Sequence, residues 1–332
     1  MMLALDARNL VLTVGFRDDS TGQGEKGRWL EVRRFGALPG RTADEYAFFL
    51  TSAWRKACTR ADGDWAPAGA SGTAGAALAG RSAEQRGGAP RACRTPESAW
   101  ISSVVPALTP QLAEAVRESF GIEAKVLGPG VKTGVKIRTD FPSEVGSDLI
   151  CEAAAAHELC AGPCLIVDYG AVLTVSAVNA LGEFLGVAIA PGLRTAADSL
   201  KRIAAQLPEV RLDPPAHAIG KSTAQSVQSG VVIGYQSLVR GLIERMGAEL
   251  MAASPSALDR EAARQTRGIV PDCAAAGRTG EAVGCSEPAL IGTGESAGAA
   301  FLASCGIRRF EPELVLEGLA AIAEKSRAAA ER

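Results

Sequence analysis

Two aspartates that each end a buried apolar strand are the first residues of this sequence that point to chemistry. Asp6 lies in the segment 3–14 (LALDARNLVLTV) and Asp168 in the segment 165–175 (LIVDYGAVLTV). In both segments a tight break follows the aspartate, and the next strand contains Val-Leu-Thr-Val. An aspartate beside a turn whose backbone N–H groups can face an anion is typical of a phosphate or metal-ion site. The repeat predicts two equivalent α/β units facing a shared cleft.

Two further polar residues begin predicted helices. Asp148 lies in the first turn of a helix expected over 145–160, and Thr223 starts a helix expected over 223–252. A carboxylate there complements the helix dipole, and a threonine there serves as an N-cap. Asp168 has a similar alternative, because it could simply cap the turn at the end of its strand. The residues alone therefore leave each of these three positions open between a structural and a chemical role.

Two glycine-rich turns resemble phosphate loops only in part. The turn 128–134 (GPGVKTG) holds Lys132 and Thr133, but no glycine directly precedes the lysine. The spacing G-x-x-x-x-G-K-[ST] of a P-loop is therefore absent, and a glycine hairpin is predicted instead. The turn 292–294 (Gly-Thr-Gly) is compatible with a nucleotide-base loop or with a simple entry into a helix.

The eight cysteines are scattered through the chain, and no basic, apolar secretory signal opens it. Both features predict reduced thiols in a cytoplasmic protein. Four metal-capable side chains are close in sequence: Cys151, His157, Cys160 and Cys164. Three of them fall on one predicted helix and the fourth on a strand, so buried thiols are expected rather than a metal site.

Length and composition set the class of protein. The chain has 332 residues, of which 47% are hydrophobic and 22% charged, with a net charge of −2. This length predicts two domains, and the composition supports a large core. A near-neutral balance argues against general nucleic-acid binding, which needs a basic face. No apolar run reaches the length of a membrane span, so no membrane association is expected.

The elements that must position the candidate residues follow from apolar patterning and caps. Strands are predicted over 2–16 with a break at 6–9, and over 29–34, 100–105, 124–127, 164–168, 172–178, 184–190 and 289–294. Helices are predicted over 42–56, 109–120, 145–160, 193–207, 223–252 and 311–329. Two small-residue insertions interrupt the pattern: 57–96, expected to be flexible, and 253–287, expected to be partly mobile with a helix over 258–266.

Nine colinear segments of this chain resemble the type III pantothenate kinases. They are 101–106 (ISSVVP), 128–134 (GPGVKTG), 145–148 (VGSD), 165–170 (LIVDYG), 188–192 (AIAPG), 206–208 (QLP), 219–223 (IGKST), 228–230 (QSG) and 316–319 (LEGL). The resemblance implies an α/β fold of two duplicated actin-like (ribonuclease H-like) domains with a cleft between them. We expect the domains to span 1–164 and 165–332.

The same resemblance implies a function. The family transfers phosphate from ATP to pantothenate, giving 4′-phosphopantothenate in coenzyme A biosynthesis. It implies Mg²⁺ with ATP, a monovalent cation (K⁺ or NH₄⁺), and a dimer with the acceptor pocket at its interface. The expected partners are pantothenate and either a second copy of this chain or a paralogous kinase subunit, with no nucleic acid and no membrane.

On the acceptor side the resemblance assigns roles to individual residues. Gly146, Ser147, Asp148 and Leu149 correspond to the family's Gly-Ala-Asp-Arg, so Asp148 inherits the role of general base. Thr223 corresponds to a threonine that contacts pantothenate, and Asp168 to the aspartate that binds the monovalent cation. Leu149 is a departure, because leucine has none of the donors of the family's arginine.

On the nucleotide side the resemblance is weaker. Asp6, Arg8 and Asn9 fall on the first phosphate loop, and Gly170 and Ala171 on the second. Arg8 stands where the family has a glycine that lets backbone approach the phosphates, although a guanidinium could also clamp a phosphate.

Three hydroxyl positions of the two loops are also lost, at Leu10, Ala171 and Leu173. Each missing preorganised donor costs about 3–4 kcal/mol of transition-state stabilisation. We therefore expect either a kinase, alone or as one subunit of a hetero-oligomeric kinase, or a non-catalytic regulatory or metabolite-sensing paralogue.

Overall fold

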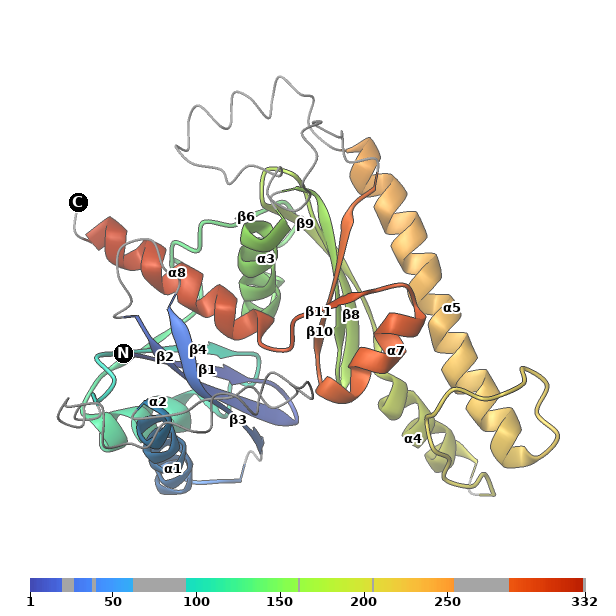
Figure 1. The fold of residues 1–332 in the computed structure, drawn as a ribbon, viewed down its shortest axis with the longest axis horizontal. Helices are drawn as coiled ribbons and strands as arrows, with labels where there is room; N and C mark the ends of the chain where they lie inside the picture. Colours follow the sequence, from blue (N-terminus) through green and yellow to red (C-terminus); the bar gives the residue numbers. More distant parts are fainter. Residues whose placement is uncertain are drawn as a thin grey trace, which may run out of the picture. The chain divides into compact units, whose positions relative to one another are not determined.

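The computed structural model describes residues 1–19, 27–37, 40–61, 94–160, 162–204, 206–253 and 287–330. The chain forms two compact units, Met1–Leu127 and Gly128–Arg332, and each is described by itself (Figure 1). In the described ranges, every helix is too short or too polar to cross a membrane.

The first unit is a five-stranded sheet with two helices. Its strands are β1 (Met2–Ala7), β2 (Val11–Asp18), β3 (Arg28–Gly36), β4 (Ser98–Ser103) and β5 (Ala124–Val126), and its helices are α1 (Ala43–Ala61) and α2 (Thr109–Phe120). The order in the sheet is β3-β2-β1-β4-β5, with β2 and β3 antiparallel and β4 and β5 parallel to their neighbours.

Alternation along β1 decides which residues of the first unit reach its core. Leu3 and Leu5 belong to a buried cluster that also contains Tyr46 and Leu50 of α1 and Leu112 of α2. Because side chains alternate between the two faces of a strand, the even-numbered residues of β1 point to the opposite face. Asp6 therefore lies on the face away from α1 and α2.

The second unit repeats the same sheet order. Its strands are β6 (Lys136–Ile137), β7 (Cys164–Tyr169), β8 (Val172–Val178), β9 (Glu183–Pro191), β10 (Ala289–Gly294) and β11 (Arg309–Phe310). They are arranged β11-β10-β7-β8-β9-β6. Read from the other edge and without the extra strand β6, the order β9-β8-β7-β10-β11 matches the order β3-β2-β1-β4-β5 of the first unit. This duplication confirms the α/β class with two actin-like (ribonuclease H-like) units.

Helices cover both faces of the second sheet. They are α3 (Ser147–Cys160), α4 (Leu193–Ile203), α5 (Thr223–Ala252), α7 (Ala299–Ser304) and α8 (Leu314–Ala330). Ile166 packs in a cluster with α3 and α8, whereas the next residue, Val167, packs in a cluster with α4, α5 and α7. In Figure 1 the long α5 runs beside the sheet, and α8 crosses α3. Alternation places Asp168 on the same face as Ile166, the face that α3 and α8 cover.

The short strand β6 is tied to the sheet by charge as well as by backbone. Arg138, just after β6, donates a hydrogen bond of 2.7 Å from Nη2 to Glu183 Oε1 on β9. Lys136 lies 3.7 Å from the same carboxylate. The Arg138 hydrogen bond, followed by one from Asn179, lowers the pKa of Glu183 against the opposing effect of burial.

Most of the predicted elements are confirmed, and the differences have identifiable causes. The capping box predicted at Thr42 and Glu45 forms, with hydrogen bonds of 2.9 and 3.4 Å. The helix predicted over 145–160 begins two residues later, after a 3₁₀ turn at Pro142–Glu144. The helices predicted over 193–207 and 311–329 span Leu193–Ile203 and Leu314–Ala330. The two-residue strands β6 and β11 and the short helix α7 were not predicted.

Two predicted boundaries differ from the structure. Helix α1 continues to Ala61, so the first five residues of the insertion expected at 57–96 are helical. The rest of that insertion over 62–93, and the insertion at 254–286, lie outside the described residues. The second unit begins at Gly128 rather than at 165, because α3 packs closely on α8. A Cβ at Gly318 of α8 would lie 1.9 Å from the carbonyl oxygen of Cys151.

The cysteines differ in one respect from the expectation of reduced thiols. Cys58 on α1 is in a disulfide, which makes that expectation wrong for this residue. Cys151, Cys160, Cys164 and Cys305 are thiols.

Candidate functional site

In the first unit, the Asp6 side chain lies beside two hydroxyl side chains and forms an ion pair with an arginine. It is 4% exposed, and it lies directly opposite Thr13 on β2 and Ser102 on β4. Paired residues on neighbouring strands point to the same face, so the three polar side chains share one face of the sheet. Arg8 Nε donates to Asp6 Oδ2 at 2.9 Å, while the Arg8 backbone N–H closes the turn onto Val11 O.

In the turn that the resemblance assigns to the first phosphate loop, the Arg8 side chain thus binds the Asp6 carboxylate at the end of the preceding strand. The guanidinium of Arg8 neutralises the buried carboxylate that the strand presents. Asn9 and Leu10 are both exposed at the tip of the turn, and the Leu10 side chain has no hydroxyl to offer.

In the second unit, Asp168 occupies the equivalent position. It is 4% exposed and lies opposite Thr174 on β8 and Thr293 on β10. The hydroxyl of Thr293 donates to a backbone carbonyl, Glu311 O, at 2.8 Å. The Thr174 hydroxyl is buried without a hydrogen-bond partner in the described structure. The second site therefore has two threonines across from its aspartate, and Gly170 stands at the position that Arg8 takes in the first.

A glycine lets β10 approach this aspartate. Gly294 has φ of +102°, and a Cβ there would lie 2.2 Å from Tyr169 O and 2.3 Å from Asp168 Oδ1. Only glycine tolerates both this backbone conformation and this approach. The turn 292–294, left open between a base loop and a helix entry, closes the end of β10 against the Asp168 carboxylate.

The turn after Asp168 leads directly to the start of α4. The Gly192 backbone N–H donates to Ala171 O at 2.9 Å, and Thr195 Oγ1 donates to the same oxygen at 2.8 Å. A Cβ at Gly192 would lie 2.0 Å from Gly170 O. Gly170 and Ala171 are thus packed on the first turn of α4, where N–H groups and the helix dipole favour an anion.

Asp148 lies in the first turn of α3 and is half-buried. Its Oδ1 accepts a hydrogen bond of 2.9 Å from the backbone N–H of Leu149, and the carbonyl of Gly146 receives the Ile150 N–H. These contacts fix the direction of the carboxylate. Ser147, the first helical residue, and Gly146 are half-buried beside it.

Leu149 has a different role from the residues on either side of it. Its side chain is 7% exposed and belongs to the core cluster of Ile166 and Phe184. The arginine of the family is therefore replaced by a residue that stabilises the packing of α3 on the sheet. Nothing at this position can donate a hydrogen bond to a substrate.

Thr223 is exposed and is the first residue of α5. The cap of this helix is Ser222, whose side chain accepts from Gln225 N at 3.3 Å, while Gln225 Oε1 accepts from Lys221 N at 2.9 Å. The alternative that Thr223 serves as the N-cap is therefore wrong. Its hydroxyl is therefore not needed to cap the start of the helix.

Within the second unit the candidate residues divide between two faces of the sheet. Asp168 lies on the face covered by α3, the helix that carries Asp148. Thr223 begins α5, which packs on the opposite face through Val231 and Val239. Within one copy of the second unit, Asp148 and Asp168 thus belong to one face of the sheet, whereas Thr223 begins a helix that covers the opposite face.

Sequence reasoning missed the two threonines that lie across from the aspartates on the neighbouring antiparallel strands. Thr13 and Thr174 stand at the same place in the repeated Val-Leu-Thr-Val, and each lies across from an aspartate. The signal was present in the repeat itself. Using it requires the register of the antiparallel pair, which the sequence does not state.

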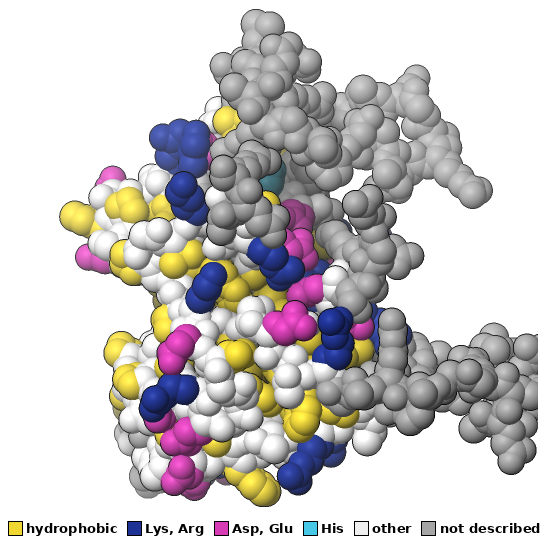
Figure 2. All heavy atoms as spheres, turned by 90° about the vertical axis from the view of Figure 1, so that its left-hand side faces the viewer, with side chains coloured by type: hydrophobic (Ala, Val, Ile, Leu, Met, Phe, Trp, Pro, Cys, Tyr) yellow, Lys and Arg dark blue, Asp and Glu magenta, His cyan; other side chains and the backbone are white. Residues whose placement is uncertain are grey.

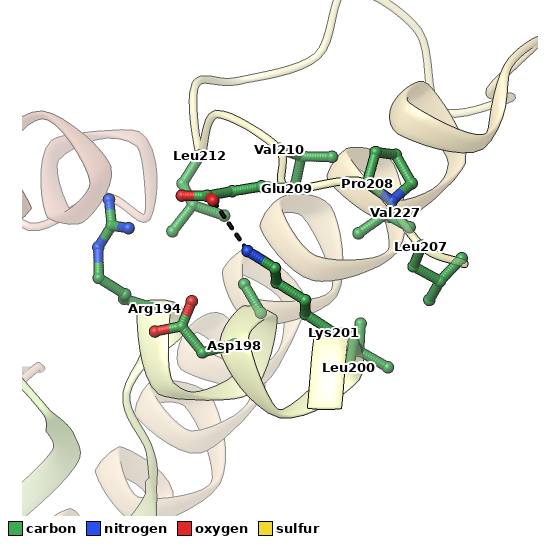
Figure 3. A pocket seen from close by; sticks show the side chains of 11 residues that line it. Arg194, Asp198, Leu200, Lys201, Leu207, Pro208, Glu209, Val210, Leu212 and Val227 are labelled. Atoms are coloured by element: carbon green, nitrogen blue, oxygen red, sulfur yellow. Dashed lines mark hydrogen bonds and ion pairs between the residues drawn. The ribbon is translucent and has the colours of Figure 1, made fainter. Parts of the chain in front are cut away.

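A small pocket, partly open to solvent, lies between α4, the segment 207–212 and Val227 of α5 (Figure 3). Lys201 and Glu209 form an ion pair of 3.0 Å across it, and this hydrogen bond lowers the pKa of Glu209. None of the residues predicted to bind substrate or nucleotide lines it. Lys201 and Glu209 are paired with each other, and the pocket is small, which makes it a poor candidate for the site.

No group of three or more His, Cys, Asp or Glu side chains in the described ranges is arranged to hold a metal ion. On the face drawn in Figure 2, basic and acidic side chains are interspersed rather than separated by sign.

Comparisons with known proteins agree with this architecture. A family model described as type III pantothenate kinase matches residues 64–245, more than half of the chain. A type III pantothenate kinase of Moorella thermoacetica is 45% identical over 150 residues, which are 45% of this chain and 59% of that protein. Type III pantothenate kinase 2 of Symbiobacterium thermophilum is 45% identical over 150 residues, 57% of its length. The match thus spans under two thirds of these relatives.

A solved structure from Campylobacter jejuni, described as a Baf family transcriptional activator, has the same fold. It aligns over 98% of this chain and 99% of its own, with a TM-score of 0.50 and 13% identity. At this identity the likeness supports the fold alone.

Proposed function

This chain belongs to the type III pantothenate kinase family, and on that premise we propose that it phosphorylates pantothenate with ATP. The product is 4′-phosphopantothenate, the entry to coenzyme A biosynthesis. The observation that carries the proposal is the carboxylate of Asp148, half-exposed in the first turn of α3 and oriented by the Leu149 N–H. A positioned carboxylate is the group that an alcohol acceptor requires.

Asp148 acts as the general base in this proposal. Its carboxylate takes the proton of the pantothenate hydroxyl as the hydroxyl oxygen attacks the γ-phosphorus of ATP. The new P–O bond forms while the bond to the ADP oxygen breaks, and ADP leaves. Phosphoryl transfer depends mainly on positioning and on electrostatic stabilisation of the transferred group. The helix dipole at Asp148 stabilises the negative charge that the base needs before it accepts the proton.

Asp168 fits a hard cation. Its carboxylate and the Thr174 hydroxyl are buried, and oxygen is the ligand that K⁺, NH₄⁺ and Mg²⁺ prefer. We assign the monovalent cation to Asp168, and Mg²⁺ enters with ATP; such charges offset those of the transferred phosphoryl group. Gly170, Ala171 and the start of α4 then offer backbone N–H groups to the phosphates.

Thr223 is proposed to contact pantothenate. Because α5 and α3 pack on opposite faces of the sheet, a pocket that holds both Thr223 and Asp148 is most simply built from two chains. This supports a dimer, either of this chain or with a paralogous kinase subunit that supplies an intact nucleotide site. Cytoplasmic location stays a prediction.

A second function is favoured by one specific observation. Arg8 is bonded to Asp6, and Leu10, Ala171 and Leu173 provide no hydroxyls at the phosphate loops. A chain whose phosphate loops no longer bind ATP, but whose acceptor pocket still binds pantothenate, would serve as a regulatory or metabolite-sensing paralogue.

Steady-state assays of the full chain with pantothenate and ATP separate these functions. The wild type should form 4′-phosphopantothenate, and Asp148→Asn should lower kcat by about 10²–10⁴-fold, the usual contribution of a general base. Asp140→Asn is the matched control, since Asp140 is an exposed carboxylate on the preceding loop. Turnover that survives Asp148→Asn would remove Asp148 from the mechanism. Saturable pantothenate binding without turnover, alone or with a paralogous subunit, would favour the sensing paralogue.

A further inference from the structure

A row of paired residues crosses the second sheet at the level of Asp168. Asp168 of β7 pairs with Thr174 of β8, and Thr174 pairs in turn with Ile189 of β9. Paired residues on neighbouring strands point to the same face, so Ile189 shares the face of the Asp168 carboxylate. Val172 of β8 and Pro191 of β9 form the next pair on that face, because side chains alternate along a strand.

The residues Ile189, Val172 and Pro191 form an apolar patch that is open to solvent. Ile189 is 67% exposed and Val172 is 39% exposed, and Pro191 beside them is exposed as well. In the described residues, β6 pairs with β9 only at 183–184, so it does not reach the patch. Hydrocarbon surface in water is unfavourable, and a bound hydrocarbon group would remove this surface from water.

The start of α3 borders the apolar patch. Val187 lies two residues before Ile189 on the same face, and it packs against the buried cluster that contains Leu149 of α3. Asp148 is the residue next to Leu149 in the first turn of that helix. Helix α3 and strand β7 follow each other in the chain and pack together, so they run in opposite directions. The first turn of α3 therefore lies toward the end of β7 that carries Asp168.

We propose that the apolar patch binds the two methyl groups of pantothenate, an inference that rests on the proposed function. In pantothenate, the CH₂–OH group that accepts the phosphoryl group is attached to a quaternary carbon, which carries both methyl groups. An acceptor hydroxyl placed between the carboxylate of Asp148 and the cation at Asp168 must therefore bring hydrocarbon to this part of the face. Ile189 is the most exposed member of the patch after the row turns from polar to apolar, which makes it the specificity-determining residue.

A second copy of this chain is the competing occupant of the patch. A stable interface between proteins buries about 800 Å² on each partner, and three side chains of this size expose only a small part of that area. Two methyl groups match the patch in size. Ligand sites also combine a mostly apolar wall with a few polar groups, as the patch does with Thr174 and Asp168 beside it.

The test compares two acceptors, pantothenate and an analogue in which hydrogen replaces both methyl groups, with the full chain and Mg-ATP. The wild type should favour pantothenate at least about tenfold in kcat/KM, the discrimination that hydrocarbon contacts provide. Ile189→Ala should reduce this preference to about threefold or less, mainly through a lower kcat/KM for pantothenate, and Ile189→Val should lie between them. Calorimetric titration with each acceptor makes the same comparison on dissociation constants.

Ile203→Ala is the matched control. It removes the same atoms from an exposed isoleucine on α4, which packs on the opposite face of the sheet, so it should keep the wild-type preference. Because Ile189 is mostly exposed, Ile189→Ala should keep the Tm of the wild type and its mass in light scattering.

The outcomes that overturn this inference differ from those that overturn the proposed function. Equal use of both acceptors by the wild type, or an undiminished preference in Ile189→Ala, would overturn the inference and leave the proposed function standing. A lower mass for Ile189→Ala would assign the patch to a contact between copies of the chain instead. Neither turnover nor binding of either acceptor would overturn the proposed function and this inference with it.

Discussion

The ion pair between Arg8 and Asp6 gives the sharpest prediction about the first unit. Two unit charges about 4 Å apart attract by about 4 kcal/mol at an effective dielectric constant near 20. The Asp6 side chain is 6% exposed and the Arg8 side chain 23% exposed, so solvent screens part of this attraction. We therefore expect a coupling free energy of about 2 kcal/mol in a double-mutant cycle of Arg8→Met and Asp6→Asn. Both changes keep the size of the side chain.

Urea unfolding followed by tryptophan fluorescence measures this coupling in the right unit. All four tryptophans precede residue 101 and therefore report on the first unit. Arg8→Met alone should cost about 2–3 kcal/mol, because it leaves a buried carboxylate without its partner. Arg117→Met, which breaks the exposed pair with Glu114 on α2, should change little and serves as the control.

The outcome that refutes this reasoning is a coupling energy within about 0.5 kcal/mol of zero, the ordinary additivity of unrelated sites. Arg8 would then not hold the Asp6 carboxylate, and the argument that its guanidinium occupies the first phosphate loop would fail.

Three further predictions concern the second unit. Thr223→Ala should raise the KM for pantothenate about tenfold, a loss of roughly 1.4 kcal/mol of binding free energy, without changing Tm. Ser222→Ala removes the helix cap, so it should lower stability by about 1 kcal/mol and leave KM unchanged. A lowered Tm with an unchanged KM for Thr223→Ala would instead make Thr223 a structural residue. Gly294→Ala should cost about 3 kcal/mol or more through strain and the clash with Tyr169 O. Gly241→Ala, in open space on α5, should gain about 0.5–1 kcal/mol. Urea unfolding followed by far-ultraviolet circular dichroism, which reports on the helices of this unit, measures both, and equal effects would refute the close approach. The pKa of Glu183 is lowered in the folded chain, so its carboxylate adds stability above its ordinary pKa near 4.5 and loses that contribution as pH falls through the folded-state pKa. Glu183→Gln should therefore make the unfolding free energy fall less steeply at acid pH. An unchanged dependence on pH would contradict this.

How far the fold follows from the sequence depends on whether a pattern is local. The strands β1 and β7, which carry Asp6 and Asp168, are apolar runs followed by tight breaks, and both were predictable. The strands β6 and β11 each hold two residues and exist only because a neighbouring strand offers backbone partners. The unit boundary at Gly128 likewise depends on contact between α3 and α8, which no local pattern encodes.

The candidate site shows the same division. Asp148 in the first turn of a helix was predictable from its motif and from helix patterning. The ion pair of Arg8 with Asp6 was not, because it depends on how the turn folds the guanidinium back over its own strand. The burial of Leu149 in the core and the capping of α5 by Ser222 also required the three-dimensional structure. From sequence alone, Thr223 could equally have been the cap, and Leu149 could equally have faced the substrate.

The central claim is that the acceptor side of this chain is kept while its nucleotide side is altered. Calorimetric titration of the full chain with pantothenate, and then with Mg-ATP, tests it most directly. We expect saturable pantothenate binding that Thr223→Ala weakens, and nucleotide binding at least about tenfold weaker than pantothenate binding, a difference of 1.4 kcal/mol. Tight Mg-ATP binding with no detectable pantothenate binding would contradict the account.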